Sequence, residues 1–322
     1  MRFLPTDEQV AFGEAIDEIV TDHGGADIAQ QWAAGDSAAG LSLWRTFAEM
    51  GLTGLRVSEA DGGFGGSLGD LVVVFERLGY HGAPGPYLES VSLLPALVDP
   101  ETRRDLAGGA IGTASVAGIA PAALDADVAT HLFALDGDTI RRATIARSVD
   151  SLAPTRRLSL LAPEGETRDL PAGMRHRALN EASLAAAALL LGSGERLLRE
   201  AVAYAGLREQ FGRPIGEFQA LKHQLADVRV ALTFARPLLW NAALEAADGD
   251  GDRAVSAAKV AASDAARLAA RIALQVHGAI GYTAEHHLRI WLGLAPALAG
   301  VWGTPAAHRA RIARTLLSSD TI

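Results

Sequence analysis

Three long stretches rich in alanine and leucine in the second half of the chain constrain its fold more than any other feature. They cover Asn180–Leu207, Phe218–Ala247 and Asp252–Val276, and a shorter helical stretch follows at Pro305–Ser318. The sequence Asp248-Gly249-Asp250-Gly251 between two of them is typical of a tight turn. Helices joined by short connections pack as antiparallel neighbours. Residues 179–322 are therefore predicted to form a four-helix bundle.

Shorter amphipathic helices are predicted near the N-terminus. Thr6 and Gln9 have the spacing of a capping box, and apolar residues follow them at helical intervals. A second helix is predicted over Leu43–Met50, where Gly51 is well placed as its C-terminal stop. These patterns predict a helical domain over residues 1–110.

A glycine-rich sequence at residues 61–67 precedes a third helix, which is predicted over Leu68–Leu78 and ends at Gly79. Such a loop could hold a phosphate through its backbone amides. Here no strand is predicted before the loop, and the loop contains no lysine. We therefore interpret it as an ordinary loop.

The middle of the chain has the alternating pattern of β-strands. The predicted strands are Thr113–Val116, Val128–Leu135, Thr139–Ala146 and Arg157–Leu161. Asp136-Gly137 is a strong signal for a hairpin turn between the second and third of these strands. The sequence thus predicts a reduced β domain over residues 111–178, between two helical domains, in a fold that is mainly α.

Composition excludes several classes of function. The formal net charge is −9, and Lys222 and Lys259 are the only lysines, so a nucleic-acid partner is not expected. There is no cysteine, which excludes disulfides and thiolate chemistry. The longest uncharged runs are shorter than the ~20 residues that span a bilayer. Neither His286-His287 nor His308 has metal-ligand spacing. We expect a soluble cytoplasmic protein without a membrane segment or a metal.

The connection between the first two long helices carries the clearest chemical signal. It runs from Arg208 through Gly212-Arg213-Pro214-Ile215-Gly216 to Gln219, and its proline makes it stiff. This arrangement brings a guanidinium, an amide side chain and a helix N-terminus together. A diphosphate would be bound well there, because arginine pairs bidentately with phosphate and helix N-termini favour anions. The alternative is an ordinary helix–helix corner with a surface arginine.

Residues 208–227 resemble the signature of the acyl-CoA dehydrogenase family, Arg-x-x-Phe-Gly-x-Pro-Ile followed by Phe-Gln and a Lys-His-x-Leu-Ala-Asp run. Residues 275–285 are similar to the Gln-x-x-Gly-Gly-x-Gly-Tyr-Thr segment of the same family, with Ala279 in place of one glycine. Residues 52–66 and 76–79 resemble two N-terminal passages of the family. The resemblance implies an N-terminal helical domain, a middle β domain and a C-terminal bundle.

The resemblance also implies a reaction, namely FAD-dependent oxidation of an acyl-CoA thioester at Cα–Cβ with a carboxylate as base. In the family, the FAD site is shared between subunits, and one chain supplies the residues around the diphosphate and adenosine. The motifs assign that role here to Arg208, Phe211, Gln219, Gln275 and Gly278. Read from the residues alone, Gly278 and its neighbour Gly281 are helix-terminating glycines.

Two features depart from the family pattern. The flavin-side loop of the family, Thr-Glu-Pro-x-x-Gly-Ser-Asp, is replaced by Ala114–Pro121. The catalytic glutamate that usually precedes a Gly-Thr pair is replaced by Trp302, and an indole cannot act as a base. Some members carry the base on an earlier helix, where the matching position here is Ala182. The neighbouring Glu181 is the one candidate base, although its direction differs by about 100° around a helix. The alternative is a glutamate stabilised at a helix start.

These features together resemble the incomplete subunit of α2β2 acyl-CoA dehydrogenases found in bacterial sterol side-chain catabolism. We therefore predict a chain that contributes the diphosphate and adenosine half of a shared FAD site to a second acyl-CoA dehydrogenase-like chain. One alternative is a self-sufficient dehydrogenase with a displaced base, acting as a homo-oligomer. Another is a scaffold or regulatory protein that has the same fold and binds no flavin.

Overall fold

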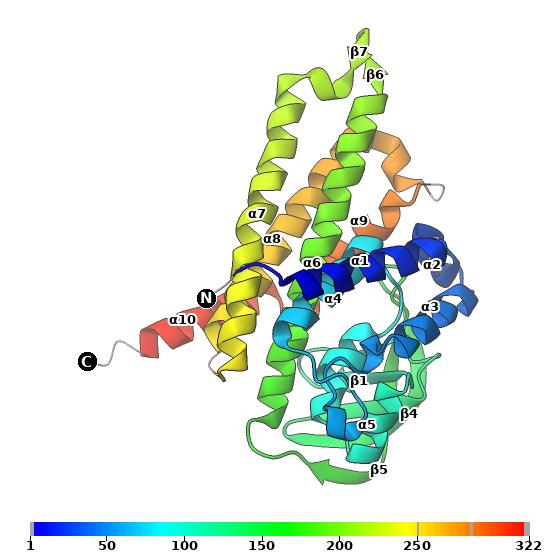
Figure 1. The fold of residues 1–322 in the computed structure, drawn as a ribbon, viewed down its shortest axis with the longest axis vertical. Helices are drawn as coiled ribbons and strands as arrows, with labels where there is room; N and C mark the ends of the chain where they lie inside the picture. The colour runs from blue at the N-terminus through cyan, green and yellow to red at the C-terminus, as the bar shows by residue number, and fades with distance from the viewer. Residues whose placement is uncertain (1–2, 250, 284–285, 319–322) are drawn as a thin grey trace.

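The computed structural model describes residues 3–249, 251–283 and 286–318, and it is mostly helical with one small mixed sheet (Figure 1). Its first helices are α1 (Asp7–Asp22), α2 (Ala26–Ala33), α3 (Ala38–Glu49), α4 (Leu68–His81) and α5 (Pro100–Ala107). The later helices are α6 (Met174–Leu207), α7 (Gln219–Ala247), α8 (Asp252–His277), α9 (Leu288–Gly300) and α10 (Pro305–Ser318). The strands are β1 (Gly112–Val116), β2 (Ala122–Leu124), β3 (His131–Asp136), β4 (Thr139–Val149) and β5 (Leu158–Asp169), with the short pair β6 (Glu209–Gln210) and β7 (Arg213–Pro214).

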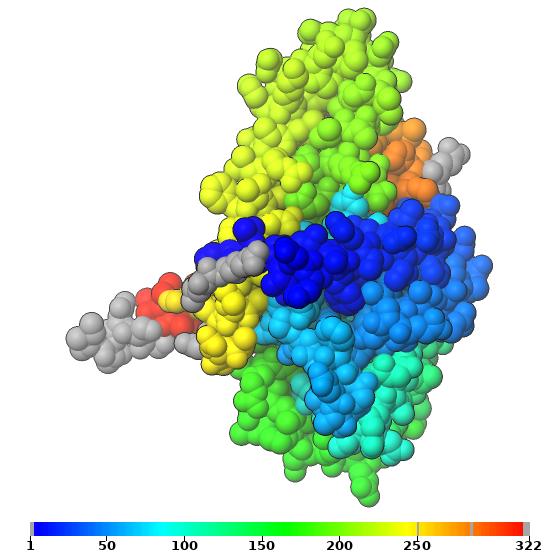
Figure 2. Space-filling model, in the orientation of Figure 1, coloured from blue at the N-terminus to red at the C-terminus, as the bar shows by residue number. Residues whose placement is uncertain are grey.

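The long helices α6, α7 and α8 pack side by side, and the α6–α7 end projects beyond the rest of the molecule (Figures 1 and 2). The N-terminal helices lie against the middle of this bundle, and the sheet lies at the end opposite β6 and β7. The predicted order of helices, β region and helical bundle is thus confirmed. The helix α6 begins at Met174 rather than at Asn180, because Gly173 adopts a left-handed conformation before it.

Local signals predicted several helix ends correctly. The Thr6 hydroxyl accepts a hydrogen bond from the Gln9 amide, and the Gln9 side chain accepts one from the Thr6 amide, which confirms the capping box. Gly51 follows α3 with φ +86°, as a left-handed C-terminal stop requires. The end predicted at Gly79 is wrong, because α4 continues to His81 and is stopped by Gly82 at φ +64°.

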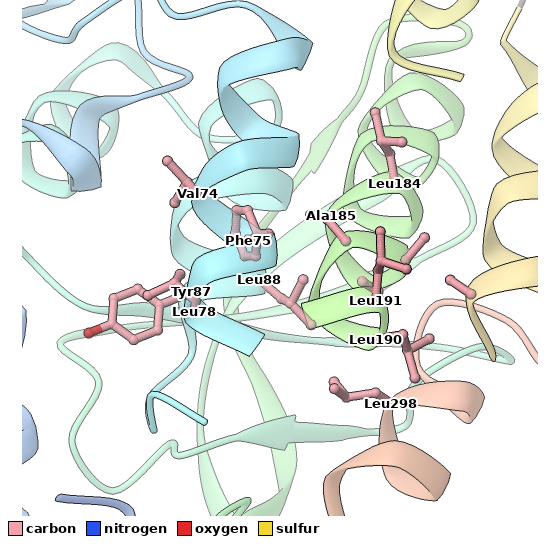
Figure 3. Packing of buried hydrophobic residues seen from close by; sticks show 14 of the residues in the cluster. Val74, Phe75, Leu78, Tyr87, Leu88, Leu184, Ala185, Leu190, Leu191 and Leu298 are labelled. Carbon is pink, nitrogen blue, oxygen red and sulfur yellow. The ribbon is translucent and has the colours of Figure 1, made fainter. Parts of the chain in front are cut away.

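Gly79 has a different role, which is close packing of α4 on α6. A side chain at Gly79 would collide with the Leu189 carbonyl, and one at Gly192 would collide with the Glu76 carbonyl. The two helices therefore touch backbone to backbone. Around this contact, Phe75 and Leu78 of α4 face the apolar side of α6 (Figure 3), and both are fully buried. The N-terminal helices and the bundle consequently share one hydrophobic core.

The sheet has the strand order β1-β3-β4-β5-β2, in which β1 and β3 are parallel and the other pairs are antiparallel. The predicted hairpin is confirmed, because Asp136 pairs with Thr139 across Gly137 at φ +52°. The strand predicted from Val128 begins only at His131, since the amide of Val128 closes a turn on the Asp125 carbonyl. The strand β5 continues far beyond Leu161, because it pairs with β4 along most of its length.

Three helices were not predicted from the sequence, namely α2, α5 and α9. The start of α5 carries a recognisable signal, because Asp99 accepts a hydrogen bond from the Thr102 amide and Pro100 occupies the first turn. The fully buried segment Leu88–Leu93 forms a turn of π-helix, which no pattern in the sequence indicated. The tight turn predicted over residues 248–251 includes residue 250, which lies outside the described residues.

By length and composition, Leu288–Leu317 is apolar enough to be a candidate membrane span. In the fold this stretch is divided between α9 and α10, because Trp302 and Gly303 both have positive φ between them. Neither helix alone has the ~20 residues that a span requires.

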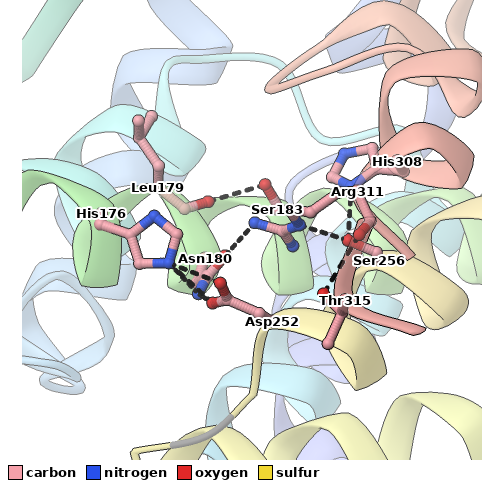
Figure 4. A network of polar contacts seen from close by, with 9 residues as sticks. All are labelled: His176, Leu179, Asn180, Ser183, Asp252, Ser256, His308, Arg311 and Thr315. Atoms are coloured by element: carbon pink, nitrogen blue, oxygen red, sulfur yellow. Dashed lines mark hydrogen bonds and ion pairs between the residues drawn. The ribbon is translucent and has the colours of Figure 1, made fainter. Parts of the chain in front are cut away.

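A polar network fixes α10 against α6 and α8 (Figure 4). The Arg311 guanidinium donates to the Asn180 side-chain oxygen at 2.6 Å and also to the Ser256 hydroxyl. Asn180 in turn donates to Asp252, whose carboxylate pairs with His176 at 2.7 Å. The last helix is therefore held partly by directional polar contacts rather than by apolar burial alone.

Candidate functional site

The connection from α6 to α7 is a small β-hairpin at the projecting end of the bundle. Strand β6 pairs with β7, and Phe211 and Gly212 form the two-residue turn with φ +54° and +79°. Two consecutive positive φ values are the requirement of a type I′ turn. The Ile215 amide then donates to the Arg208 carbonyl at 2.8 Å, which returns the chain beside the end of α6. The sequence predicted a stiff corner here but not a hairpin.

Phe211 is an unusual residue for this turn. A non-glycine residue in the left-handed region carries a conformational cost of about 1 kcal/mol or more, and the Phe211 side chain is 92% exposed. Its ring makes an edge contact with Phe218 at 6.1 Å, and the Arg213 guanidinium lies 4.3 Å from the Phe218 ring centre. The hairpin tip therefore combines a strained backbone with an exposed aromatic side chain.

The second motif segment lies at the end of α8. Gln275 occupies the last turn of the helix and is exposed, and Gly278 ends it with φ +63° and ψ −142°. A side chain at Gly278 would meet no atom within 4 Å, so glycine is needed here for its backbone conformation and not for lack of space. The His277 ring stacks on Tyr204 of α6 at 4.4 Å. Because Tyr204 is one helical turn before Arg208, the two motif segments lie at the same end of the bundle.

The five residues predicted to bind cofactor share one property, which is exposure to solvent: Arg208, Phe211, Gln219, Gln275 and Gly278. Within the described residues, the side chains of Arg208, Gln219 and Gln275 have no hydrogen-bond or ion-pair partner. The structure therefore leaves a guanidinium and two amides exposed and without partners among the described residues.

The stretch that replaces the flavin-side loop is a closed turn with few free donors. The Val116 amide donates to the Ala120 carbonyl at 2.7 Å, and the Ala120 amide donates back to Val116 at 2.9 Å. The Ala117 amide is also occupied, by the Leu135 carbonyl. Ser115 is the one hydroxyl-bearing residue of Ala114–Pro121. The donors that a flavin ring needs are therefore scarce in this stretch, whereas donors suited to a diphosphate are exposed at the hairpin.

The Trp302 indole is packed into the core at the position where the family motif places a glutamate. It is 4% exposed, and its Nε1 has no hydrogen-bond partner among the described residues. Lys259 stabilises the turn between α9 and α10, because its ammonium donates to the carbonyls of Leu298, Ala299 and Gly303 at 3.0–3.3 Å. Burial lowers the pKa of Lys259 to about 7. This turn is a filled, internally bonded structure, and residues 298–304 include no carboxylate.

Glu181 lies two turns inside α6, so the alternative of a glutamate at the helix start is wrong. Its carboxylate forms a bidentate pair with Arg56, with Nε–Oε1 at 2.6 Å and Nη2–Oε2 at 3.1 Å. Arg56 also donates to the Gly66 carbonyl. The pair joins α6 to the loop before α4, which is a structural role.

The glycine-rich loop is a packed loop, in agreement with the interpretation from sequence. A side chain at Gly63 would collide with the Val57 carbonyl, and one at Gly66 would crowd Leu55. Ser67 and Asp70 then form a capping box at the start of α4. The glycines allow backbone segments to meet and do not surround a vacant phosphate site.

Several buried ionisable residues escaped prediction, among them Asp125, Lys259 and Glu89. Lys259 carried a signal, because it is one of two lysines and lies in an alanine-rich helix. Glu89 had none, since its burial depends on the π-helix. In the described part of the chain, no group of three or more His, Cys, Asp or Glu side chains is placed to hold a metal.

Comparison with known proteins gives consistent matches along the chain. The model of the acyl-CoA dehydrogenase N-terminal domain matches residues 6–97, and that of the C-terminal domain matches residues 173–317. Acyl-CoA dehydrogenase IpdE2 of Mycobacterium tuberculosis is 34% identical over 298 residues, which cover 89% of this chain and 90% of that protein. IpdE2 of Mycolicibacterium smegmatis is 32% identical and covers 95% of this chain and 98% of its own length.

Solved structures share the fold. The ChsE4–ChsE5 complex from Mycobacterium tuberculosis matches with a TM-score of 0.85 and 23% identity over the full length of both chains. A structure described as a Tcur3481–Tcur3483 steroid ACAD variant matches with a TM-score of 0.85 and 24% identity, covering 98% of this chain and 99% of that one. With two family models and two relatives that match nearly end to end, the chain belongs to the acyl-CoA dehydrogenase family.

Proposed function

We propose that this chain is the incomplete subunit of a heteromeric acyl-CoA dehydrogenase. In this proposal its α6–α7 hairpin and the end of α8 contribute the diphosphate and adenosine half of an FAD site. A second acyl-CoA dehydrogenase-like chain contributes the flavin half and the catalytic base. FAD bound at the shared site supplies the hydride acceptor for α,β-dehydrogenation of an acyl-CoA.

The observation that carries this proposal is that Arg208, Gln219 and Gln275 are exposed and their side chains have no partner among the described residues, together with the exposed, strained Phe211. A diphosphate needs a positive charge and hydrogen-bond donors to leave water. These residues supply both, but they are exposed to solvent, so this chain alone does not exclude water from them. A partner chain that covers Arg208, Gln219 and Gln275 would complete the site.

Two features weigh against a self-sufficient enzyme with a displaced base. Trp302 fills the usual position of the base, and Glu181 is engaged by Arg56. The closed turn of Ala114–Pro121 offers few donors to a flavin ring. A scaffold that binds no flavin has no need for an exposed arginine and two exposed amides without partners. These residues therefore also favour the heteromeric function.

The relatives support the same proposal and narrow the substrate. The similar structures include a ChsE4–ChsE5 complex and a steroid ACAD with two named components. We infer that the acyl group is a product of steroid breakdown and that the partner is encoded with this chain. The reaction takes place in the cytoplasm in this proposal.

Replacement of Arg208 tests the proposal directly. In the complex co-expressed with its partner, Arg208→Ala should lower FAD affinity by about one to two decades, because a charge-assisted contact contributes roughly 1.5–3 kcal/mol. Arg208→Lys should rescue binding only in part, since an ammonium cannot make two parallel bonds. Flavin absorbance and the melting temperature, with and without added FAD, are the measurements.

The matched control is Arg213→Ala, which removes an exposed arginine of the same hairpin that stacks on Phe218. It should change FAD content much less. An Arg208→Ala complex with full FAD content and an equally lowered melting temperature in both conditions would identify a structural corner residue. One tightly bound FAD per chain in the isolated protein would instead establish the self-sufficient enzyme.

A further inference from the structure

A small cavity lies where the end of α4, residues 82–88, the loop before β5, and helices α6 and α9 meet. Leu78, Tyr87, Leu88 and Leu298, which Figure 3 shows around this region, contribute to its wall. Its volume is about 30 Å3, which is room for roughly two water molecules. The cavity is far too small for an acyl chain, and none of its lining residues is among those proposed to bind the cofactor.

The cavity contains polar groups that no described residue satisfies. The Tyr87 hydroxyl and the Thr155 hydroxyl are both buried and have no hydrogen-bond partner among the described residues. Arg156 also lines the cavity, and its side chain has no hydrogen bond or ion pair to any described residue. Ser193, by contrast, donates to the Leu189 carbonyl at 2.8 Å. Buried polar groups without partners are rare and call for a bound species.

Two carboxylates lie near Arg156 without contacting it. Asp125 accepts from the Trp32 indole at 3.1 Å and pairs with Arg157 at 3.3 Å, and it acts on Arg156 only through its charge. Glu89 is fully buried on the π-helix and likewise acts on Arg156 only through its charge. Burial raises the pKa of Asp125 to about 6 and that of Glu89 to about 7. Among the described residues, no carboxylate forms a hydrogen bond or ion pair with the Arg156 guanidinium, so its donors are unpaired.

We propose that this cavity binds a carboxylate group through Arg156, Tyr87 and Thr155. All three side chains donate hydrogen bonds, and a guanidinium with two hydroxyls suits the two oxygens of a carboxylate. Water would satisfy the hydroxyls but would not balance the charge of the partly buried Arg156 guanidinium. The site requires neither FAD nor a partner chain, so it does not rest on the proposed function.

Formate is the probe that matches the cavity volume, and formamide is its neutral isostere. Titration of the full chain with 13C-labelled formate, followed by NMR, should show saturable binding at one site. Formamide should bind at least about tenfold more weakly, because it lacks the charge that pairs with arginine. Equal binding of the two would overturn the proposal.

Arg156→Gln should abolish formate binding, whereas Arg147→Gln, an exposed arginine of β4, should leave it unchanged. Tyr87→Phe keeps the ring and removes only the hydroxyl, so it should weaken binding about three- to tenfold without unfolding the chain. The Tyr87→Phe variant therefore still tests the site if the Arg156→Gln variant does not fold. Unchanged affinity in Tyr87→Phe together with unchanged affinity in a folded Arg156→Gln would refute the site.

Two further arms identify the ligand and its proton linkage. Hexanoate binding more tightly than formate would assign the site to the carboxylate end of an aliphatic ligand, and the reverse would assign it to a small carboxylate.

The charged groups acting on Glu89 are Arg156 and Asp125. Since ionised Glu89 competes for Arg156, formate should bind several-fold more tightly at pH 6 than at pH 8. In Glu89→Gln this pH dependence should become smaller, because only the contribution of Asp125 is left; an unchanged pH dependence would contradict the assigned geometry.

Discussion

The hairpin between α6 and α7 and the turn between α9 and α10 both place a large aromatic residue in the left-handed region of backbone conformation. Phe211 has φ +54° and Trp302 has φ +56°. Phe211 is 92% exposed, whereas Trp302 is 4% exposed. At Trp302 the cost is offset within the chain, by burial of the indole and by the bonds from Lys259. At Phe211 the ring contact given among the described residues is the edge contact with Phe218, which leaves the side chain almost fully exposed, and we therefore assign the compensating contact to a partner.

A carboxylate placed at Trp302 gives the strongest test of whether the buried turn is closed, in contrast to the exposed turn at Phe211. Trp302→Glu should lower the free energy of unfolding by about 4 kcal/mol or more, because it creates a void and buries a charge. The isolated chain should remain inactive toward acyl-CoA in a dye-reduction assay. Phe234→Glu, at a residue 71% exposed, is the control and should change stability by less than about 0.5 kcal/mol.

An active Trp302→Glu variant would show that the rest of a catalytic site is already present in this chain. A variant as stable as the wild type would show that the turn is not closed. Either outcome would remove the contrast between the two turns.

Lys259→Met examines what holds the buried turn. Methionine preserves most of the side-chain length but leaves three carbonyls without their donor, so unfolding free energy should fall by about 2–3 kcal/mol. Urea denaturation of the isolated chain measures this loss. Lys222→Met changes the only other lysine, which is exposed on α7, and should have little effect. Equal effects of the two substitutions would mean that the Lys259 bonds do not support the turn.

The smallest expected effect concerns the open hairpin. Phe211→Gly should raise the unfolding free energy of the isolated chain by about 0.5–1 kcal/mol, since glycine adopts positive φ without strain. The same substitution should weaken assembly with the partner, which sedimentation of the co-expressed complex can follow. Phe211→Ala separates the two effects, because it loses the ring but retains the strain.

Phe211→Ala should therefore weaken assembly without a gain in stability. If Phe211→Gly instead destabilises the isolated chain and leaves assembly unchanged, the ring acts within this chain and the partner surface is elsewhere.

Much of the helical framework could be predicted because its signals are local. The Thr6–Gln9 capping box and Gly51 determine helix ends through neighbouring atoms, so a short window of sequence suffices. Gly79 was wrongly predicted to end α4. Its role is close contact with α6, which the neighbouring sequence does not indicate. The longer β5 depends likewise on pairing with β4 rather than on its own composition.

The candidate site divides in the same way. The motif placed Arg208 and Gln275 at one end of the bundle, and the Tyr204–His277 stack agrees with that placement. The engagement of Glu181 by Arg56 joins residues 125 positions apart, which a helical projection cannot indicate. The burial of Trp302 and the cavity beside Arg156 are products of packing between several elements, so only the folded chain reveals them.

The backbone contact between α4 and α6 also determines where this molecule can move. The first two thirds of α6 are clamped against α4 through Gly79 and Gly192, whereas Val202 and Leu207 near its end are 52% and 83% exposed. One continuous helix therefore spans a rigid base and a weakly supported tip. Amide hydrogens should exchange slowly with solvent near Leu190 and quickly near Leu207. A partner that binds the hairpin would then be detected as slower exchange at the tip alone, with the base as an internal reference.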